Sequence, residues 1–107
     1  MGGSGARPYR RGMVTLHIEH AISDYGTWRA AFDAVADARH RAGVTAERIA
    51  QPVDDERYIV VDLDFPTTDQ AAGFLRFLES RVWASSAASP ALAGRPRTMI
   101  VQQAPTS

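Results

Sequence analysis

The residues best suited to acid–base chemistry are a histidine and an aspartate in two separate apolar segments. His17 lies within MVTLHIEH, and Asp62 lies within RYIVVDLDF. If these segments form neighbouring strands, both side chains face the same side of the sheet. An imidazole titrates near neutral pH, and a carboxylate can orient its ring. The pair therefore predicts a catalytic base or hydrogen-bond donor, although a plain cross-strand polar contact explains the same residues and is the commoner arrangement.

Four further side chains are expected to line a ligand pocket on that same face. The Tyr58 hydroxyl and the Arg48 guanidinium are groups that can hold a phenolate or a carboxylate. Thr15 and Val60 complete the predicted pocket. A tyrosine in a strand is more often a packing residue, and an arginine is more often a surface residue, so a structural role remains the alternative.

Other kinds of chemistry find little support in the sequence. The chain contains no cysteine, which excludes disulfides, thiolate metal sites and a cysteine nucleophile. The acidic run at 54–56 stands in a short turn, where turn chemistry explains aspartate without a metal ion. The glycine-rich stretches do not link a strand to a helix, as a phosphate-binding loop must. We therefore expect neither a metal nor a cofactor.

Length and charge limit the possible partners. A chain of 107 residues is one domain, and its formal net charge is zero, which gives no electrostatic support for nucleic-acid binding. No apolar run approaches the roughly 18 residues of a membrane span. Residues 1–12 are expected to be a disordered leader or a cloning remnant, residues 13–103 the folded domain and residues 104–107 a tail. Without an apolar segment typical of a secretory signal, we expect a cytoplasmic protein.

The periodicity of apolar residues predicts the elements that position these side chains. Strands are predicted at 13–20, at 44–51 (more weakly), at 57–65 and at 97–103. Helices are predicted at about 24–41 and from Thr67 onward, followed by an irregular connection over 84–94. In the first helix, Trp28 and Phe32 lie on the apolar stripe and are expected to pack in the core.

The resulting order, β-α-β-β-α-β, is the ferredoxin-like arrangement of the α+β class. It predicts a four-stranded antiparallel sheet of order 4-1-3-2 with both helices on one face. The pattern does not settle which residues of the second and fourth strands lie on the helix-free face. That face is of mixed polarity, and such a surface is often an interface. We therefore expect a homodimer in which two sheets pack face to face around a lumen that could hold a ligand.

Four segments together resemble the dimeric α+β barrel superfamily, which includes the antibiotic-biosynthesis monooxygenase-like domains. They are MVTLHIEH, DYGTWRAAFD, RYIVVDLDF and FLRFLESRVWASSAASPALAG, and the resemblance extends over about residues 13–103. The spacing D-Y-x-x-W-x-x-x-F is similar to that of small actinobacterial-type members. The resemblance implies the dimeric barrel fold, but this superfamily carries out several different reactions on one fold.

The resemblance implies a small-molecule-binding barrel, and one possible activity is that of a cofactor-independent oxygenase acting on an aromatic or polyketide-type substrate. The alternative is a dimeric stress-response or ligand-carrying barrel without chemistry of its own. The asparagine-containing set of the haem-degrading members is not matched, because this sequence has no asparagine. A catalytic lumen would need a cavity of roughly 300 Å³ or more with His17 facing into it.

Overall fold

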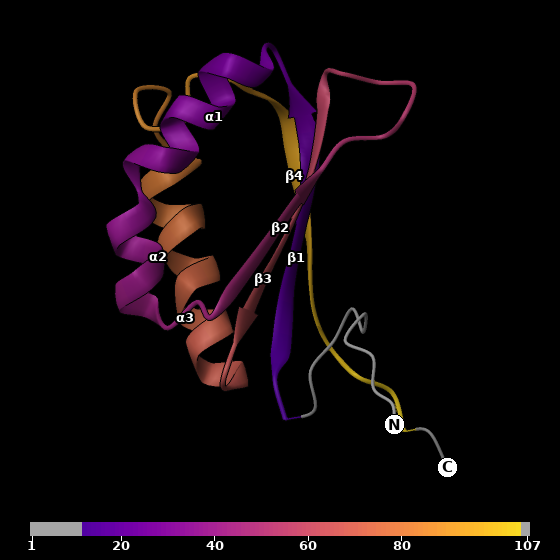
Figure 1. Cartoon of the computed structure of the whole chain (residues 1–107). Coiled ribbons are helices and arrows are strands. Elements are labelled where there is room, and N and C mark those ends of the chain that lie inside the picture. The colour runs from indigo at the N-terminus through magenta and orange to yellow at the C-terminus, as the bar shows by residue number, and fades with distance from the viewer. Residues whose placement is uncertain (1–11, 106–107) are drawn as a thin grey trace.

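The computed structural model describes residues 12–105, and these form one antiparallel sheet covered by helices on one face (Figure 1). The strands lie in the order β2-β3-β1-β4, which is the predicted order read from the opposite edge. Most of the predicted leader lies outside the described residues. The elements are β1 (Val14–Ile22), α1 (Tyr25–Ala34), α2 (Ala36–Ala42), β2 (Ala46–Ala50), β3 (Tyr58–Phe65), α3 (Thr68–Phe77), the π-helical turn η1 (Leu78–Val82) and β4 (Leu92–Gln102).

The core lies between the sheet and the helices. It is built from alternate residues of β1 and β3, among which Leu16, Ile59 and Phe65 have no exposed surface. From the helices, Trp28 and Phe74 are buried against this layer. Burying side chains of this size contributes roughly 1.5–3 kcal/mol each, which makes the apolar alternation of the two central strands the main determinant of the fold.

The first helix is interrupted, whereas the sequence predicts a continuous one. Val35 separates α1 from α2, and its backbone N–H turns back to the carbonyl of Phe32. The guanidinium of Arg39 also donates to that carbonyl, and Arg39 forms an ion pair with Glu47 of β2 at 2.6 Å. Arg39 is only 4 % exposed and stacks over the Phe32 ring at 3.6 Å. Arg39 therefore joins the helix break to the sheet.

The last strand begins at Leu92, five residues earlier than the prediction of 97. The register between β1 and β4 shifts between Glu19 and Ala21, so β4 bulges and then pairs again with the end of β1. Gly94 lies within the bulge with a φ of 92°. A left-handed backbone of this kind favours glycine, and the prediction stopped at this residue because glycine normally marks the end of a connection.

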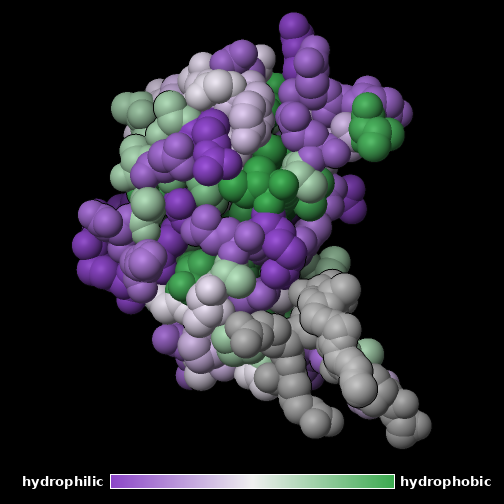
Figure 2. Space-filling model, viewed as in Figure 1, coloured by the Kyte–Doolittle hydropathy of each residue, from purple (hydrophilic) through white to green (hydrophobic). Residues whose placement is uncertain are grey.

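The surface reflects this layering. Figure 2 shows hydrophilic side chains over much of the helix layer and a hydrophobic surface between that layer and the sheet. Among residues 12–105, no helix is both long enough and apolar enough to cross a membrane.

Candidate functional site

The six residues predicted to form a site all come from the helix-free face of the sheet. Antiparallel pairing places His17 opposite Asp62, and Thr15 opposite Asp64. Arg48 of β2 is opposite Asp62 on its other side, and Met99 of β4 is opposite His17. Because paired residues point to the same side of a sheet, the register resolves the two open choices. The residues of β2 and β4 on this face are Ala46, Arg48 and Ala50, and Arg97, Met99 and Val101.

Both ring nitrogens of His17 contact carboxylates. Nδ1 lies 2.8 Å from Asp62, and Nε2 lies 2.8 Å from Glu19. Glu19 in turn accepts a hydrogen bond from the Tyr58 hydroxyl at 2.7 Å. An ionised carboxylate only accepts hydrogen bonds, so both nitrogens donate at once only when the ring is the imidazolium. Within this network His17 is a hydrogen-bond donor and a cation.

The electrostatics of this network agree with its geometry. The hydrogen bond to Glu19 raises the pKa of His17; burial opposes the rise, and Asp62 adds to it. The hydrogen bonds from His17 and then Tyr58 lower the pKa of Glu19. The hydrogen bond to Glu19 also raises the pKa of the Tyr58 hydroxyl. The imidazolium, the carboxylate and the protonated phenol therefore stabilise one another.

A second polar group on this face surrounds Asp64, which is 1 % exposed. Arg48 donates two hydrogen bonds of 3.0 Å to its carboxylate, and the Thr15 hydroxyl donates a third of 2.6 Å. A bidentate arginine pair is rigid and strong, which suits the placement of a buried charge. Val60 lies beside these groups without joining them, half-buried opposite Glu19. Four of the six predicted residues thus carry two hydrogen-bond networks, and Tyr58 extends the first.

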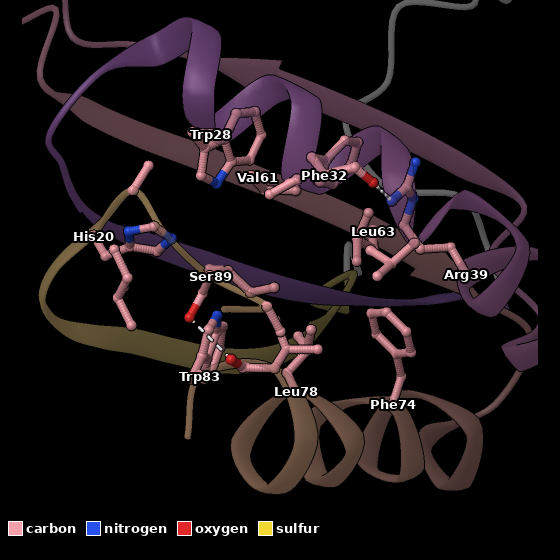
Figure 3. A pocket seen from close by; sticks show the side chains of 17 residues that line it. His20, Trp28, Phe32, Arg39, Val61, Leu63, Phe74, Leu78, Trp83 and Ser89 are labelled. Carbon is pink, nitrogen blue, oxygen red and sulfur yellow. Dashed lines mark hydrogen bonds between the residues drawn. The ribbon is translucent and has the colours of Figure 1, made fainter. Parts of the chain in front are cut away.

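A cavity lies on the opposite side of the sheet, between it and the helices. We call it the helix-side cavity; it has a volume of about 70 Å³. Figure 3 shows its labelled side chains facing one another from the sheet, from α1 and α2, and from the segment around α3 and η1. Its lining is mainly apolar and aromatic, and it includes Trp28, Phe32, Phe74, Trp83, His20 and Arg39.

The aromatic side chains of this cavity are held in fixed arrangements. The Trp28 and Phe32 rings stack at 4.9 Å between centroids, as their spacing of one helical turn allows. On the opposite wall, Trp83 follows the π-helical turn η1. The backbone N–H of Trp83 donates a hydrogen bond to the carbonyl of Leu78. The hydroxyl of Ser89 ties the following turn to Val82 and Ser85. π-helical turns are often found at functional sites.

His20 is the titratable side chain that the sequence analysis missed. It lies on the buried face of β1 and is 4 % exposed. Its Nδ1 is 2.8 Å from the carbonyl of Ala21, and its ring meets Trp83 edge-on at 6.4 Å. Burial is the main cause of the lowered pKa of His20. The signal was available, because the alternation that buries Leu16 and Ile18 also directs His20 into the core.

The ligand space expected on the helix-free face requires the sheet of a second copy, and it stays a prediction. The described chain has its aromatic cavity on the helix side, and none of the six predicted site residues lines it. Trp28 and Phe32 do pack against the core as expected, but they also leave a space beneath them. Periodicity predicts which face is buried, and it does not predict how completely that face is filled.

The acidic turn at 54–56 is exposed in the structure. Between residues 12 and 105, no group of three or more histidine, aspartate or glutamate side chains is arranged to hold a metal ion.

Solved structures with the same fold are antibiotic-biosynthesis monooxygenase proteins and other ferredoxin-like proteins. SnoaB, a cofactor-independent oxygenase from Streptomyces nogalater, matches with a TM-score of 0.66 at 14 % identity over 89 % of this chain and 96 % of its own. A protein from Bordetella bronchiseptica that is classed with the antibiotic-biosynthesis monooxygenases has a TM-score of 0.65. It is 13 % identical over 88 % of this chain and 99 % of its own. A dimeric ferredoxin-like protein from an uncultured marine organism has a TM-score of 0.59. It is 8 % identical over 89 % of this chain and 98 % of its own.

These similarities establish the fold and leave the activity open, because one fold serves many reactions. No protein-family model matches the sequence, and no curated protein sequence matches it either.

Proposed function

We propose that this protein binds a small aromatic molecule in the helix-side cavity and oxidises it with dioxygen, without a cofactor. The observation that carries the proposal is the cavity itself, a partly open space lined by the rings of Trp28, Phe32 and Trp83. Aromatic side chains offer flat surfaces on which another ring stacks. The fold that this chain shares with the cofactor-independent oxygenase SnoaB supports an oxygenase activity.

The volume limits what the cavity can take. About 70 Å³ is several times the 10–15 Å³ that a water molecule needs, and less than the 300–1,000 Å³ of a typical drug-sized ligand site. A ligand with more than one ring therefore has to widen the cavity as it binds. The wall formed by Leu78–Val82 and the turn after it is the side that we expect to move, because its helix is already irregular.

The reaction that suits such a site is the oxidation of an electron-rich phenol or enol. When an activated ring CH₂ becomes a carbonyl, the substrate gives four electrons to dioxygen. One oxygen atom enters the product, and the other leaves as water. The substrate itself supplies the electrons, so the protein has only to bind the ring, promote its ionisation and exclude water.

We further propose that two copies pack through their helix-free faces. Met99 is 60 % exposed on that face, in the outer strand β4, and the half-buried Val101 lies two residues further along the same strand. A similar solved structure is that of a dimeric ferredoxin-like protein. In such a dimer, Thr15, His17, Arg48, Tyr58, Val60 and Asp62 line the space between the sheets. His17 then donates to a ligand there only by exchanging its hydrogen bond to Asp62 or Glu19 for one to the ligand.

Tryptophan fluorescence tests the proposed ligand site directly. The chain has two tryptophans, and both line the cavity. A hydroxylated naphthalene should quench their emission saturably, and the cavity-filling change Ala31→Leu should weaken this binding at least about tenfold, because it removes the space for the ring. Ala30→Leu, on the exposed side of the same helix, should leave binding unchanged.

The same samples distinguish the oxygenase from a ligand carrier. With a bound hydroxynaphthalene and no added cofactor, an oxygen electrode should record consumption that Ala31→Leu abolishes. Saturable quenching without oxygen consumption would favour the alternative, a ligand-carrying barrel. An unquenched wild-type protein would refute the aromatic site altogether.

A further inference from the structure

His20 presents a bare ring nitrogen to the helix-side cavity. A carbonyl oxygen only accepts hydrogen bonds, so the contact between Nδ1 and the Ala21 carbonyl places the proton on Nδ1. The lone pair of the neutral ring is then on Nε2. Within residues 12–105, no side chain or backbone group makes a hydrogen bond to Nε2. In Figure 3 the ring projects from one end of the cavity toward its interior.

The surroundings of His20 keep it neutral and well positioned. Its ring is 4 % exposed and packs edge-on against Trp83, in a cavity whose lining is mostly hydrocarbon. Burial lowers the pKa of the imidazole, so the ring is uncharged at neutral pH and able to accept a proton. His20 also lies at the register shift between β1 and β4, and such bulges often lie beside active sites.

We propose that His20 is the general base that accepts the hydroxyl proton of a phenol or enol bound in the helix-side cavity, an inference that rests on the proposed function. The O–H bond of the ligand breaks and its electron pair stays on oxygen. The proton forms a new N–H bond at Nε2. The imidazolium keeps its hydrogen bond from Nδ1 to Ala21, which stabilises the new charge beside the phenolate.

The geometry distinguishes His20 from the other histidine of the same strand. His17 contacts a carboxylate with each ring nitrogen, so neither nitrogen is free to accept a proton from a ligand. It also faces the other side of the sheet and does not line the cavity. The matched control for His20→Gln is His40→Gln, because His40 is an exposed histidine of α2 that lines neither the cavity nor the helix-free face.

A nitrophenol is a suitable probe, because its absorption spectrum distinguishes the phenol from the phenolate. Quenching of tryptophan fluorescence measures its binding, and the absorption of the bound probe measures its ionisation. At a pH below the ionisation of the free probe, wild type should bind part of it as phenolate. In His20→Gln the ratio of bound phenolate to phenol should fall about tenfold, which is one pKa unit of the bound probe. His40→Gln should match wild type.

The possible outcomes separate the two proposals. A probe that does not bind to wild type overturns the proposed function, and the role of His20 with it. A probe that binds to all three proteins with the same ionisation overturns the role of His20 alone.

A measurement on wild type keeps the inference testable if His20→Gln does not fold. Nitrogen-15 NMR of the imidazoles should show His20 protonated on Nδ1 and bare on Nε2. Its Nε2 resonance should move toward that of a protonated nitrogen when the nitrophenol is added. A free protein with the proton on Nε2, or a resonance that the probe leaves unchanged, would refute the proposal.

Discussion

Two histidines three residues apart have opposite electrostatic environments. His17 faces the helix-free side of the sheet between the carboxylates of Asp62 and Glu19. His20 faces the core, where it contacts the Ala21 carbonyl and Trp83. The pleat of one strand therefore holds one ring as a cation and the other as a neutral base. The histidine that looked most reactive in the sequence is the one whose nitrogens are both engaged.

These environments give the stability of the protein a pH dependence with two opposite contributions. The native pKa of His17 is raised, so its stabilisation is complete below its usual value of 6.5 and is lost as pH rises through the native pKa. The native pKa of His20 is lowered, so its stabilisation is present above 6.5 and is lost as pH falls through the native pKa.

Urea unfolding at a series of pH values measures both contributions. His17→Gln should remove the loss of stability that wild type shows as the pH rises above 6.5. His20→Gln should remove the loss of stability that wild type shows as the pH falls below 6.5. Proton NMR titration of wild type provides the independent check. If both rings titrate at the same pH near 6.5, the described environments are wrong.

At the scale of elements, two glycines of the helix layer should respond oppositely to alanine. Gly43 caps α2 with a φ of 102°, and a Cβ there would lie 2.6 Å from the Gln70 side chain. Gly43→Ala should therefore cost about 1 kcal/mol or more. Gly73 lies inside α3, and its nearest contact would be the end of Arg76 at 3.8 Å. Gly73→Ala should stabilise the protein by about 0.5–1 kcal/mol.

Each glycine variant serves as the control for the other. Chemical unfolding followed by circular dichroism should move the two midpoints in opposite directions. If both variants are destabilised alike, α3 is packed more tightly at Gly73 than the structure shows.

The elements that the sequence predicts well are those with a strong apolar period. The alternation in β1 and β3 is uninterrupted, and the threonine cap at Thr67 has its expected bond to Gln70. The break at Val35 was not predicted, because it depends on Arg39 reaching the Phe32 carbonyl from another turn. Similarly, the early start of β4 depends on its pairing with β1 beyond the bulge. Such long-range contacts leave no local pattern in the sequence.

The same distinction between local pattern and long-range packing applies to the candidate site. The contact between His17 and Asp62 follows from strand order and alternation, and both can be derived from the sequence. The helix-side cavity depends on how Trp28, Phe32 and Trp83 fill the layer between the sheet and the helices. Local periodicity identifies buried residues, and a cavity is a property of their combined volumes.

At the scale of the whole molecule, the sheet separates two surfaces with different roles. Its helix side holds the proposed ligand cavity inside one chain. Its free side carries the polar networks of His17 and Asp64, and the exposed Met99 of the outer strand β4 lies opposite His17. A surface of this composition resembles a protein interface, in which polar groups are paired and apolar side chains become buried on association. The ligand site and the proposed dimer contact can therefore be altered independently.

Met99→Glu tests the dimer by placing a charge at an exposed apolar position of the free face. Sedimentation velocity should show wild type as a dimer. The dimer of the variant should have a dissociation constant at least about tenfold higher, because an apolar contact is lost and a charge is buried. Val53→Glu is the matched control, since Val53 is also an exposed apolar residue but lies in the loop between β2 and β3. It should remain a dimer. Quenching by the hydroxynaphthalene should persist in both variants, because the cavity lies within one chain. A monomeric wild type would refute the proposed dimer. A loss of ligand binding on dissociation would show that the ligand site and the dimer contact are not independent.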